Sequence, residues 1–517
     1  MALSRSIDEL EILLRARYSV IYIVSWEESR VEDALAQIAR RREKRVMLWS
    51  VARGLYPYTA LAETSRRVDT RTTDPNSALD AVYENMENAV YVFRDLHAFW
   101  SDPGVVRRVR ELAVALKNSY KTLVIIGPTL QLPLELQKEV VVVEFDMPNR
   151  QELGELLERT VQEVSESTGH MIEVTDSARR RILDAASGLT IGEAENVLAR
   201  TLVMSGGLSE ADLPIILSEK EQAIRKSGLL EYYHPNAGLR DVGGLDILKE
   251  WLVKRGAAFL DDARDFGLPA PRGILLIGVQ GCGKSLVAKA VASLWEFPLL
   301  RLDVGRLFGS LVGTSEENVR NAIRTAESVA PAVLWIDEID KSFGNGSGSG
   351  GDGGTTARVL ATLLTWMQEK TAPVFVVATA NSVDQLPPEL LRRGRLDETF
   401  FVDLPDPRER AEIFQIHLTR RSRDPRRFDL SSLANRSEGF SGAEIEQCVI
   451  DALFEAYSRR QDLSTELIET ACANMIPLSH MMREPIDRLR KWADGRARTA
   501  SSLNEPAAHD TGLIARN

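Results

Sequence analysis

Residues 273–285 read GILLIGVQGCGKS, and this stretch decides the fold of the second half of the chain. Residues 273–278 form a short apolar run that predicts a buried strand, and a pattern with helical period follows Ser285. Gly278 to Ser285 match the pattern GxxxxGK[ST] between strand and helix, in which backbone N–H groups converge on phosphate at the positive end of a helix. The motif predicts a phosphate site in which Lys284 reaches the β- and γ-phosphates and Ser285 ligates Mg²⁺.

Further apolar runs on both sides of this motif predict an α/β fold with a mostly parallel sheet. Each run is rich in β-branched residues, and helical patterns separate them. From Pro407 the pattern is helical only, to about Leu478, which predicts a small helical lid. The other strands expected in this half are residues 299–303, 332–337, 374–379 and 399–403.

Two of these strands end in polar residues that suit nucleotide chemistry. Asp337 and Glu338 follow one strand, where buried acids are costly unless a cation or a reacting group offsets them. We expect Asp337 to hold Mg²⁺ and Glu338 to polarise the water that attacks the γ-phosphate. Asn381 ends the next strand, where it either positions this water or simply forms a turn.

The sequence LLRRGRLD at residues 390–397 gathers arginines in one turn. Guanidinium groups stabilise the charge of a transferring phosphoryl group, and a neighbouring subunit can supply them. The three arginines of this turn are therefore candidates for contact with a phosphoryl group bound by an adjacent copy. A solvated basic turn is the alternative.

The first half also alternates apolar runs with helical patterns. Strands are expected at residues 19–24, 45–51, 90–95, 123–126 and 140–145, and helices from 150 to about 204. Similar strings, residues 187–195 and 438–446, stand near the end of each helical stretch, so either the chain is duplicated or it holds two unrelated α/β domains. The first strand leads into Ser25-Trp-Glu-Glu-Ser29 instead of a glycine loop, and no acidic pair follows the third. We expect a non-hydrolysing domain that serves as scaffold or adaptor.

The predicted organisation has five parts. Residues 1–205 form the domain without a phosphate loop, and residues 206–240 a connector with a short helix at 219–226. Residues 241–405 form the ATPase core and 406–480 the lid. Residues 481–517 form a basic helix and a disordered tail; this helix either docks onto another domain or subunit or stays solvated.

Composition excludes several classes of protein. The 517 residues carry a net charge of −11, the wrong sign for a domain that coats a phosphate backbone, so nucleic acid is not the expected partner. Three cysteines make no disulfide framework, and no apolar run reaches the ~20 residues of a membrane helix. The start of the chain lacks the pattern of a signal peptide. These features predict a cytoplasmic protein without a membrane span.

The constellation from Asp241 to Leu478 resembles the AAA ATPases, in the branch of proteasomal and FtsH-type unfoldases. Its marks are the string Asp241-Val-Gly-Gly-Leu, the phosphate loop, the acidic strand, LLRRGRLD and the string Gly439-Phe-Ser-Gly-Ala-Glu. The resemblance implies an ATPase that acts as a ring, expected to be a hexamer, with Glu338, Asn381, Arg392 and Arg395 as catalytic residues and Ser285 and Asp337 as Mg²⁺ ligands. The nucleotide-binding residues that it implies are Val242, Gly243, Gly278, Val279, Gln280, Gly281, Cys282, Gly283, Lys284, Ser285, Leu286 and Asp337.

A narrower resemblance covers the connector, core and tail. The strings at residues 225–231, 241–252, 364–381 and 489–498 are similar to the cyanobacterial and plastid-encoded AAA family called hypothetical chloroplast reading frame forty-six. This resemblance implies a ring that remodels or regulates a protein partner, linked to photosynthesis or inorganic-carbon use. The alternatives are a nucleotide-gated scaffold with little hydrolysis and a nucleic-acid remodelling ATPase.

Two departures from the unfoldase pattern bear on threading of a substrate. Leu311 stands where a pore loop presents an aromatic residue, and it offers less contact area. A glycine-rich stretch at residues 344–354 replaces a second pore loop and is either a spacer or a substrate contact.

Overall fold

The computed structural model divides into two compact units, residues 1–220 and 221–517. It describes residues 5–58, 68–85, 87–226, 228–233, 238–259, 263, 266–308, 314–343, 353–392 and 394–502. The pore-loop prediction at Leu311 and most of the glycine-rich stretch lie outside the described residues. Helix α8 (Leu213–Lys226) crosses the division between the units.

The second unit is built on a seven-stranded sheet in the order β13-β12-β8-β11-β10-β9-β7. All neighbouring strands run parallel except β7, which is antiparallel to β9 at the edge. The five central strands are those predicted from the sequence, and the short edge strands were not predicted. The strands are β7 (Leu230–Tyr233), β8 (Gly273–Gly278), β9 (Leu299–Leu302), β10 (Ala332–Ile336), β11 (Val374–Ala380), β12 (Glu398–Val402) and β13 (Arg498–Thr499).

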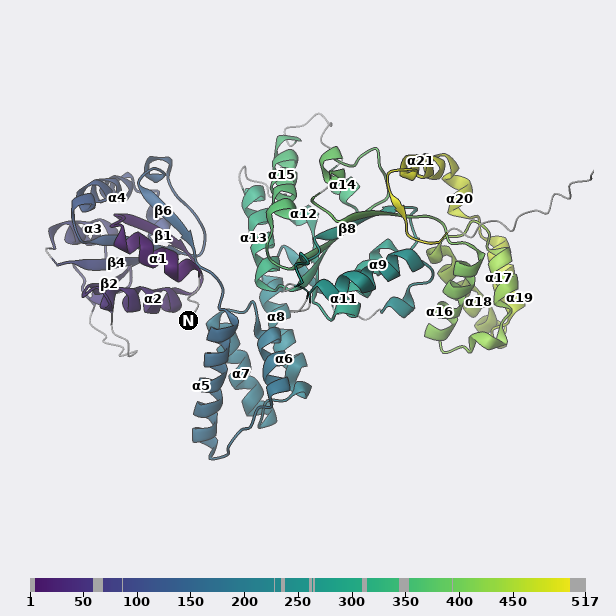
Figure 1. The fold of residues 1–517 in the computed structure, drawn as a ribbon, viewed down its shortest axis with the longest axis horizontal. Coiled ribbons are helices and arrows are strands. Elements are labelled where there is room, and N and C mark those ends of the chain that lie inside the picture. The colour runs from purple at the N-terminus through teal and green to yellow at the C-terminus, as the bar shows by residue number, and fades with distance from the viewer. Residues whose placement is uncertain are drawn as a thin grey trace, which may run out of the picture. The chain divides into compact units, whose positions relative to one another are not determined.

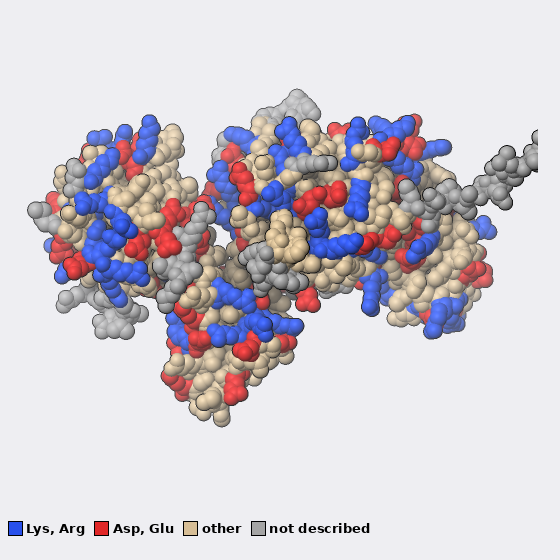
Figure 2. Space-filling model, in the orientation of Figure 1, with Lys and Arg blue, Asp and Glu red and all other residues tan. Residues whose placement is uncertain are grey.

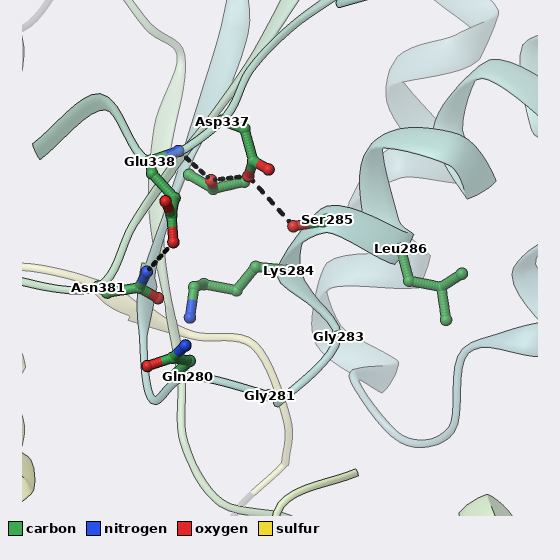
Figure 3. Close-up of a pocket in the computed structure, with 10 residues that line it drawn as sticks. Gln280, Gly281, Gly283, Lys284, Ser285, Leu286, Asp337, Glu338 and Asn381 are labelled. Atoms are coloured by element: carbon green, nitrogen blue, oxygen red, sulfur yellow. Dashed lines mark hydrogen bonds between the residues drawn. The ribbon is translucent and has the colours of Figure 1, made fainter. Parts of the chain in front are cut away.

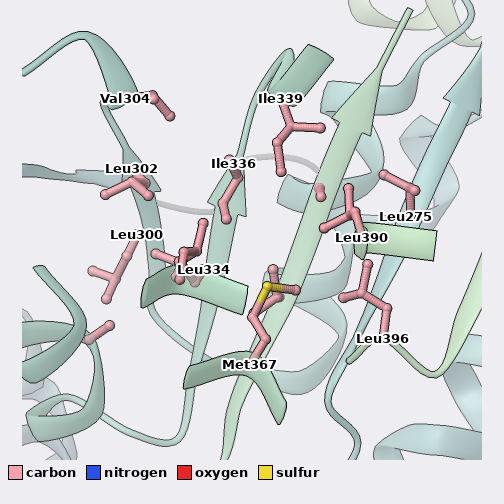
Figure 4. Close-up of a cluster of buried hydrophobic side chains, with 14 of the residues drawn as sticks. Leu275, Leu300, Leu302, Val304, Leu334, Ile336, Ile339, Met367, Leu390 and Leu396 are labelled. Atoms are coloured by element: carbon pink, nitrogen blue, oxygen red, sulfur yellow. The ribbon is translucent and has the colours of Figure 1, made fainter. Parts of the chain in front are cut away.

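Helices cover both faces of this sheet, because successive strand residues point to opposite sides and both sides are apolar. Leu334 and Ile336 face one buried cluster, shown in Figure 4, to which α13 and α15 contribute. Val333 and Trp335 face the other, with α9 and α11. The core helices are α9 (Asp246–Gly256), α11 (Lys284–Trp295), α12 (Val304–Leu307), α13 (Thr314–Ser328), α14 (Ile339–Phe343) and α15 (Gly353–Glu369).

A separate helical cluster follows the core and forms the predicted lid, with its own buried side chains from α16 to α19. The C-terminal helix α21 does not stay solvated. Its Leu489 and Ala493 are buried in the cluster of Figure 4, and β13 then pairs with β12. The tail thus docks onto the core of its own chain. The helices are α16 (Pro407–Arg420), α17 (Leu430–Arg436), α18 (Gly442–Ser458), α19 (Thr465–Asn474), α20 (Leu478–Met481) and α21 (Arg483–Ala493).

The first unit has a six-stranded sheet in the order β3-β2-β4-β5-β1-β6 and three helices after it. The sheet is again parallel, except for the edge strand β3. Its strands are β1 (Val20–Val24), β2 (Arg45–Ser50), β3 (Gly54–Pro57), β4 (Ala89–Arg94), β5 (Thr122–Gly127) and β6 (Val140–Glu144). Its helices are α1 (Arg5–Arg15), α2 (Glu28–Arg40), α3 (Pro75–Glu84), α4 (Pro103–Ala115), α5 (Arg150–Thr168), α6 (Asp176–Ala186) and α7 (Ile191–Ser205).

The two units share one topology, which favours duplication over two unrelated domains. Counted along each chain segment, the first five parallel strands stand in the order fifth, first, fourth, third, second in both sheets, with an antiparallel strand beyond the second; the second unit adds β13 beside the fifth. The strings that look alike in the sequence also share local structure: Thr190 with Glu193, and Ser441 with Glu444, each form a capping box that begins α7 and α18.

The segment between the units differs from the predicted connector. Its helix begins at Leu213, not at Glu219, and β7 joins the sheet of the second unit. The segment from 221 onward is therefore part of the second unit.

Candidate functional site

The glycine loop between β8 and α11 lies at the carboxyl end of the sheet, the edge at which open parallel sheets bind ligands. Gly281 and Gly283 have φ of 79° and 86°, a left-handed conformation that glycine adopts without steric cost. The loop thereby turns back over the N-terminus of α11, where backbone N–H groups are free of partners within the helix. Figure 3 shows this loop and the side chains that face it.

The loop borders a cavity of about 300 Å³, a size typical of small-molecule sites. Three strand ends and the start of α11 contribute side chains to it, and most of the residues predicted for phosphate and magnesium are among them. The lining residues are Gln280, Gly281, Gly283, Lys284, Ser285, Leu286, Asp337, Glu338, Thr379 and Asn381.

Lys284 is buried, and its ammonium faces the loop. Its Nζ donates hydrogen bonds to the carbonyl oxygens of Gly278 at 2.9 Å and Val279 at 2.7 Å. Burial lowers the pKa of Lys284 to about 8, because the loss of water around the ammonium outweighs the attraction of nearby acids such as Asp337 and Asp340. A bound phosphate would add negative charge beside the ammonium.

The hydroxyl of Ser285 and the carboxylate of Asp337 meet at the other side of the cavity. Ser285 Oγ donates to Asp337 Oδ1 at 3.1 Å, and Thr379 Oγ1 donates to the same oxygen at 2.7 Å (Figure 3). The second carboxylate oxygen, Oδ2, accepts neither of these bonds. Hydroxyl and carboxylate oxygens are the ligands that Mg²⁺ prefers, so these residues fit the ion.

Glu338 stands beside Asn381 with its carboxylate toward the cavity. Asn381 Nδ2 donates to Glu338 Oε1 at 3.1 Å, and Lys341 Nζ lies 2.7 Å from the same oxygen. Glu338 has φ of 49°, an uncommon conformation for a residue with a side chain, and its N–H donates to Thr379 Oγ1 at 2.9 Å. The turn after β10 is thus held so that Glu338 faces the cavity beside the tip of β11.

Thr379 and Asp340 are two residues of this site that the sequence reasoning missed. Thr379 joins Asp337 to the backbone of Glu338. The buried Asp340 accepts the N–H groups of Asn381 and Ser382 at 3.1 and 2.8 Å and so holds the end of β11. Residues two apart in a strand point to the same face, so Thr379 lies on the same face as Asn381. This spacing could have identified Thr379 as a site residue from the sequence.

Some predicted nucleotide residues lie behind the cavity. Gly278 and Val279 offer their carbonyl oxygens to Lys284. The Cys282 side chain packs against the apolar cluster under α11, and burial raises the pKa of its thiol to about 12. A thiol that stays protonated is a poor target for oxidation, which favours its role as a small filler.

Val242 and Gly243 also lie outside the cavity lining: Val242 is buried in the apolar cluster with α9 and α11, and Gly243 faces the first lid helix. A side chain on Gly243 would meet Ile413 of α16 at 2.5 Å. The next two residues, Gly244 and Leu245, donate their N–H groups to Glu412 and Glu409 of α16 at 3.0 and 3.1 Å. The string Asp241-Val-Gly-Gly-Leu is therefore where core and lid join.

The lid also contacts the glycine loop directly. Ala443 N, at the start of α18, donates to the carbonyl oxygen of Gly281 at 3.1 Å. A side chain at Gly281 would meet Ser441 Oγ at 2.9 Å. The lid helix thus begins against the loop that would carry the phosphates.

The two predicted arginine fingers do not line the cavity. Arg392 is exposed, and Arg395 donates to the carbonyl oxygen of Glu389 in its own turn. Of the residues described around the cavity, none is an arginine.

In the first unit, internal ion pairs occupy the places that correspond to this site. Glu27, in the short loop after β1, accepts the N–H of Ile191 at the start of α7 at 2.6 Å, and Arg30 lies 2.8 Å from its other oxygen. Arg94 stands at the end of β4, where the second unit has Asp337, and pairs with the buried Glu32 at 2.6 Å. Both glutamates of the Ser25-Trp-Glu-Glu-Ser29 loop are therefore paired within the unit, Glu27 with Arg30 and Glu28 with Arg94 at 3.4 Å.

Comparison with known proteins identifies the parts of the chain. Residues 274–404 match the model of the ATPase family associated with various cellular activities (AAA), and residues 427–469 match an AAA+ lid domain. Residues 6–145 match the N-terminal domain of SpoVK-like AAA ATPases, and residues 151–227 match their second domain.

Full-length relatives carry the AAA name. The chain is 41% identical over 500 residues to an uncharacterized AAA domain-containing protein ycf46 of Trieres chinensis, with 96% of this chain and 98% of the relative covered. The ycf46 protein of Guillardia theta is 39% identical over 96% of both chains. A cell division cycle protein 48 homolog of Archaeoglobus fulgidus is 33% identical over 62% of this chain and 46% of that protein.

Fold, loop and lid together define an AAA ATPase module, preceded by an N-terminal SpoVK-like domain. Within that class, the chain belongs to the ycf46 family of AAA domain-containing proteins. Among the described residues, no helix combines the length and apolarity that crossing a bilayer requires.

Proposed function

We propose that this protein binds ATP with Mg²⁺ and hydrolyses it. The observation that carries the proposal is the convergence of the glycine loop, the Ser285–Asp337 pair and the Glu338–Asn381 pair on one cavity. Magnesium bound there would offset the negative charge of the phosphates. Lys284 would bind the phosphates, and Ser285 and Asp337 would hold the ion.

Glu338 is the group that we assign to the attacking water. Its carboxylate faces the cavity and accepts the Asn381 amide, which leaves its second oxygen for a water. A carboxylate beside a water can orient it and accept its proton, a contribution of about 10²–10⁴ in rate. The Asn381 amide would hold Glu338, and its own oxygen is a second partner for the same water.

The absence of an arginine among the described residues that line the cavity supports a ring. Phosphoryl transfer gains from a guanidinium that stabilises the developing charge, and a neighbouring copy can supply one. Arg392 is exposed and lies outside the cavity of its own chain, as a residue donated to a neighbour must. We infer a homo-oligomeric ring, with a hexamer as the expected form.

A protein is the partner that we propose for remodelling or regulation. Figure 2 shows basic and acidic side chains interspersed over the second unit on the face drawn, and the net charge of −11 has the wrong sign for a protein that coats a phosphate backbone. The first unit, whose corresponding site is neutralised by internal pairs, is a candidate scaffold or adaptor for that partner. A link with photosynthesis or inorganic-carbon use rests on the family alone.

The experiment that tests hydrolysis is Glu338→Gln, which keeps the shape and removes the charge. ATP turnover should fall about 10²–10⁴-fold while nucleotide affinity stays within a few fold. Glu455→Gln is the matched control, because Glu455 pairs with Arg459 on a helix surface as Glu338 pairs with Lys341, away from the cavity.

The result can also separate hydrolysis from the nucleotide-gated scaffold. Unchanged turnover in Glu338→Gln would refute the catalytic assignment. Wild-type assembly that follows ATP binding, with negligible turnover, would favour the scaffold. The variant should trap assembled rings with ATP, and proteins captured on them would identify the partner.

A further inference from the structure

A cation of the protein itself stands beside the proposed magnesium ligand. Arg301 lies on β9, paired in register with Trp335 of β10, and its guanidinium stacks 5.1 Å from the centre of the Trp335 ring. Asp337 lies two residues beyond Trp335, on the same face. Arg301 Nη2 is 3.8 Å from Asp337 Oδ2, the oxygen that Ser285 and Thr379 do not use.

The same arginine contacts the strand that follows α8. Glu231 of β7 is the register partner of Arg301 on the other side, so Glu231, Arg301 and Trp335 form one row across three strands. Arg301 Nη1 is 3.5 Å from Glu231 Oε2 and 3.5 Å from the hydroxyl of Tyr233. Arg301 therefore stands between two carboxylates, one at the nucleotide site and one on the edge strand.

Electrostatics makes this arrangement sensitive to magnesium. Two cations cannot both lie close to one carboxylate without mutual repulsion, and a divalent ion attracts a carboxylate more strongly than a half-exposed guanidinium does. An ion held by Ser285 and Asp337 would weaken the hold of Asp337 on Arg301. The long arginine side chain has Glu231 within reach on its other side.

We propose that Arg301 is a positioning residue that holds Asp337 while magnesium is absent and transfers to Glu231 of β7 when magnesium nucleotide binds. The proposal rests on the proposed function, since it requires a magnesium nucleotide in the cavity. It connects the state of that cavity to β7, which joins the sheet directly after α8, the helix that crosses the division between the units. The strand would then be held more firmly in the nucleotide-bound state.

The test is the magnesium dependence of nucleotide binding in the full chain. The binding of a fluorescent, non-hydrolysable ATP analogue is titrated with Mg²⁺ in Arg301→Gln and Arg301→Lys. Without the competing guanidinium, Arg301→Gln should need about two- to fivefold less Mg²⁺ for half-maximal binding, the scale of a partly exposed ion pair. Arg301→Lys, which keeps a cation, should remain closer to wild type.

Arg306→Gln is the matched control. Arg306 also contacts Glu231, at 3.8 Å, and pairs with Asp303, but among the described residues it forms no ion pair with Asp337. Its magnesium dependence should equal that of wild type. An equal shift in Arg306→Gln, or no shift or a higher requirement in Arg301→Gln, would overturn the proposal.

A second measurement follows the strand itself. Amide hydrogen exchange of residues 230–233 should slow when magnesium nucleotide binds to wild type, and this change should be lost in Arg301→Gln. Equal slowing in both proteins would overturn the transfer to Glu231. Absence of nucleotide binding in wild type would instead refute the proposed function, and this inference with it.

Discussion

Arg30 is the centre of the ion pairs that join the helices of the first unit to its sheet. Its guanidinium contacts Glu27 Oε2 at 2.8 Å, Glu152 of α5 at 2.9 Å and the carbonyl oxygen of Asp146 at 2.6 Å. Its side chain is 11% exposed, and those of Glu27 and Glu152 are 8% and 26% exposed. Replacement by methionine keeps the packing volume and leaves both carboxylates without their cation.

The expected cost comes from that burial. Breaking a buried ion pair by removal of one partner costs about 3–5 kcal/mol, and the partial exposure of Glu152 places this case near the lower value. Amide hydrogen exchange in the full chain measures local opening. If the free energy of local opening falls by about 3 kcal/mol, amide exchange in β1 and at the start of α7 should become about a hundredfold faster. Exchange in β8 to β11 of the second unit should stay unchanged.

Arg107→Met is the control for this prediction. Arg107 pairs with Glu111 at 2.7 Å on the surface of α4, with side chains 67% and 57% exposed. Such a pair contributes at most about 1 kcal/mol, so exchange should change by no more than about fivefold. If Arg30→Met and Arg107→Met had the same effect, the idea that buried ion pairs hold the first unit together would be refuted.

Two further predictions concern the second unit. Because burial lowers the pKa of Lys284 to about 8 and a phosphate would raise it, nucleotide binding takes up a proton above pH 8. Nucleotide affinity can be measured by titration with a fluorescent ATP analogue. It should be constant below pH 8 and fall by up to about tenfold per pH unit above pH 8. An affinity that stays constant up to pH 9.5 would contradict this prediction. Leu489→Ala should destabilise the docked tail by about 2–4 kcal/mol, because Leu489 is buried in the core of the sheet. Limited proteolysis should then cut near residues 483–502 faster than in Lys491→Ala, an exposed position of the same helix; equal rates would contradict it.

The central strands were predictable because each is buried on both faces. Runs such as 273–278 and 374–379 are almost entirely apolar. Such a run can be recognised as a buried strand without knowing which strands lie beside it. The edge strands β3, β7 and β13 have two to four residues and were missed. Their pairing depends on an open sheet edge, which the local sequence does not reveal.

The phosphate loop and its acidic partners were predictable because the glycines, the lysine and the strand-end acids have fixed spacing. The packing position of the C-terminal helix was not predictable. Ile486, Leu489 and Trp492 define an apolar face, but the pattern does not say what covers it. The covering surface belongs to the sheet of the same unit and is formed by strands that all end before residue 403.

The sequence alone indicated the class of the protein, the positions of the central strands and the chemistry of the loop from Gly278 to Ser285. These features depend on residue type and on neighbours close along the chain. Tertiary structure decided which side chains share a charge. It placed Arg301 between Asp337 and Glu231, and Arg30 between Glu27 and Glu152. Such pairs form between segments brought together by sheet pairing and helix packing, and the charge that a buried group meets is set by distance in space.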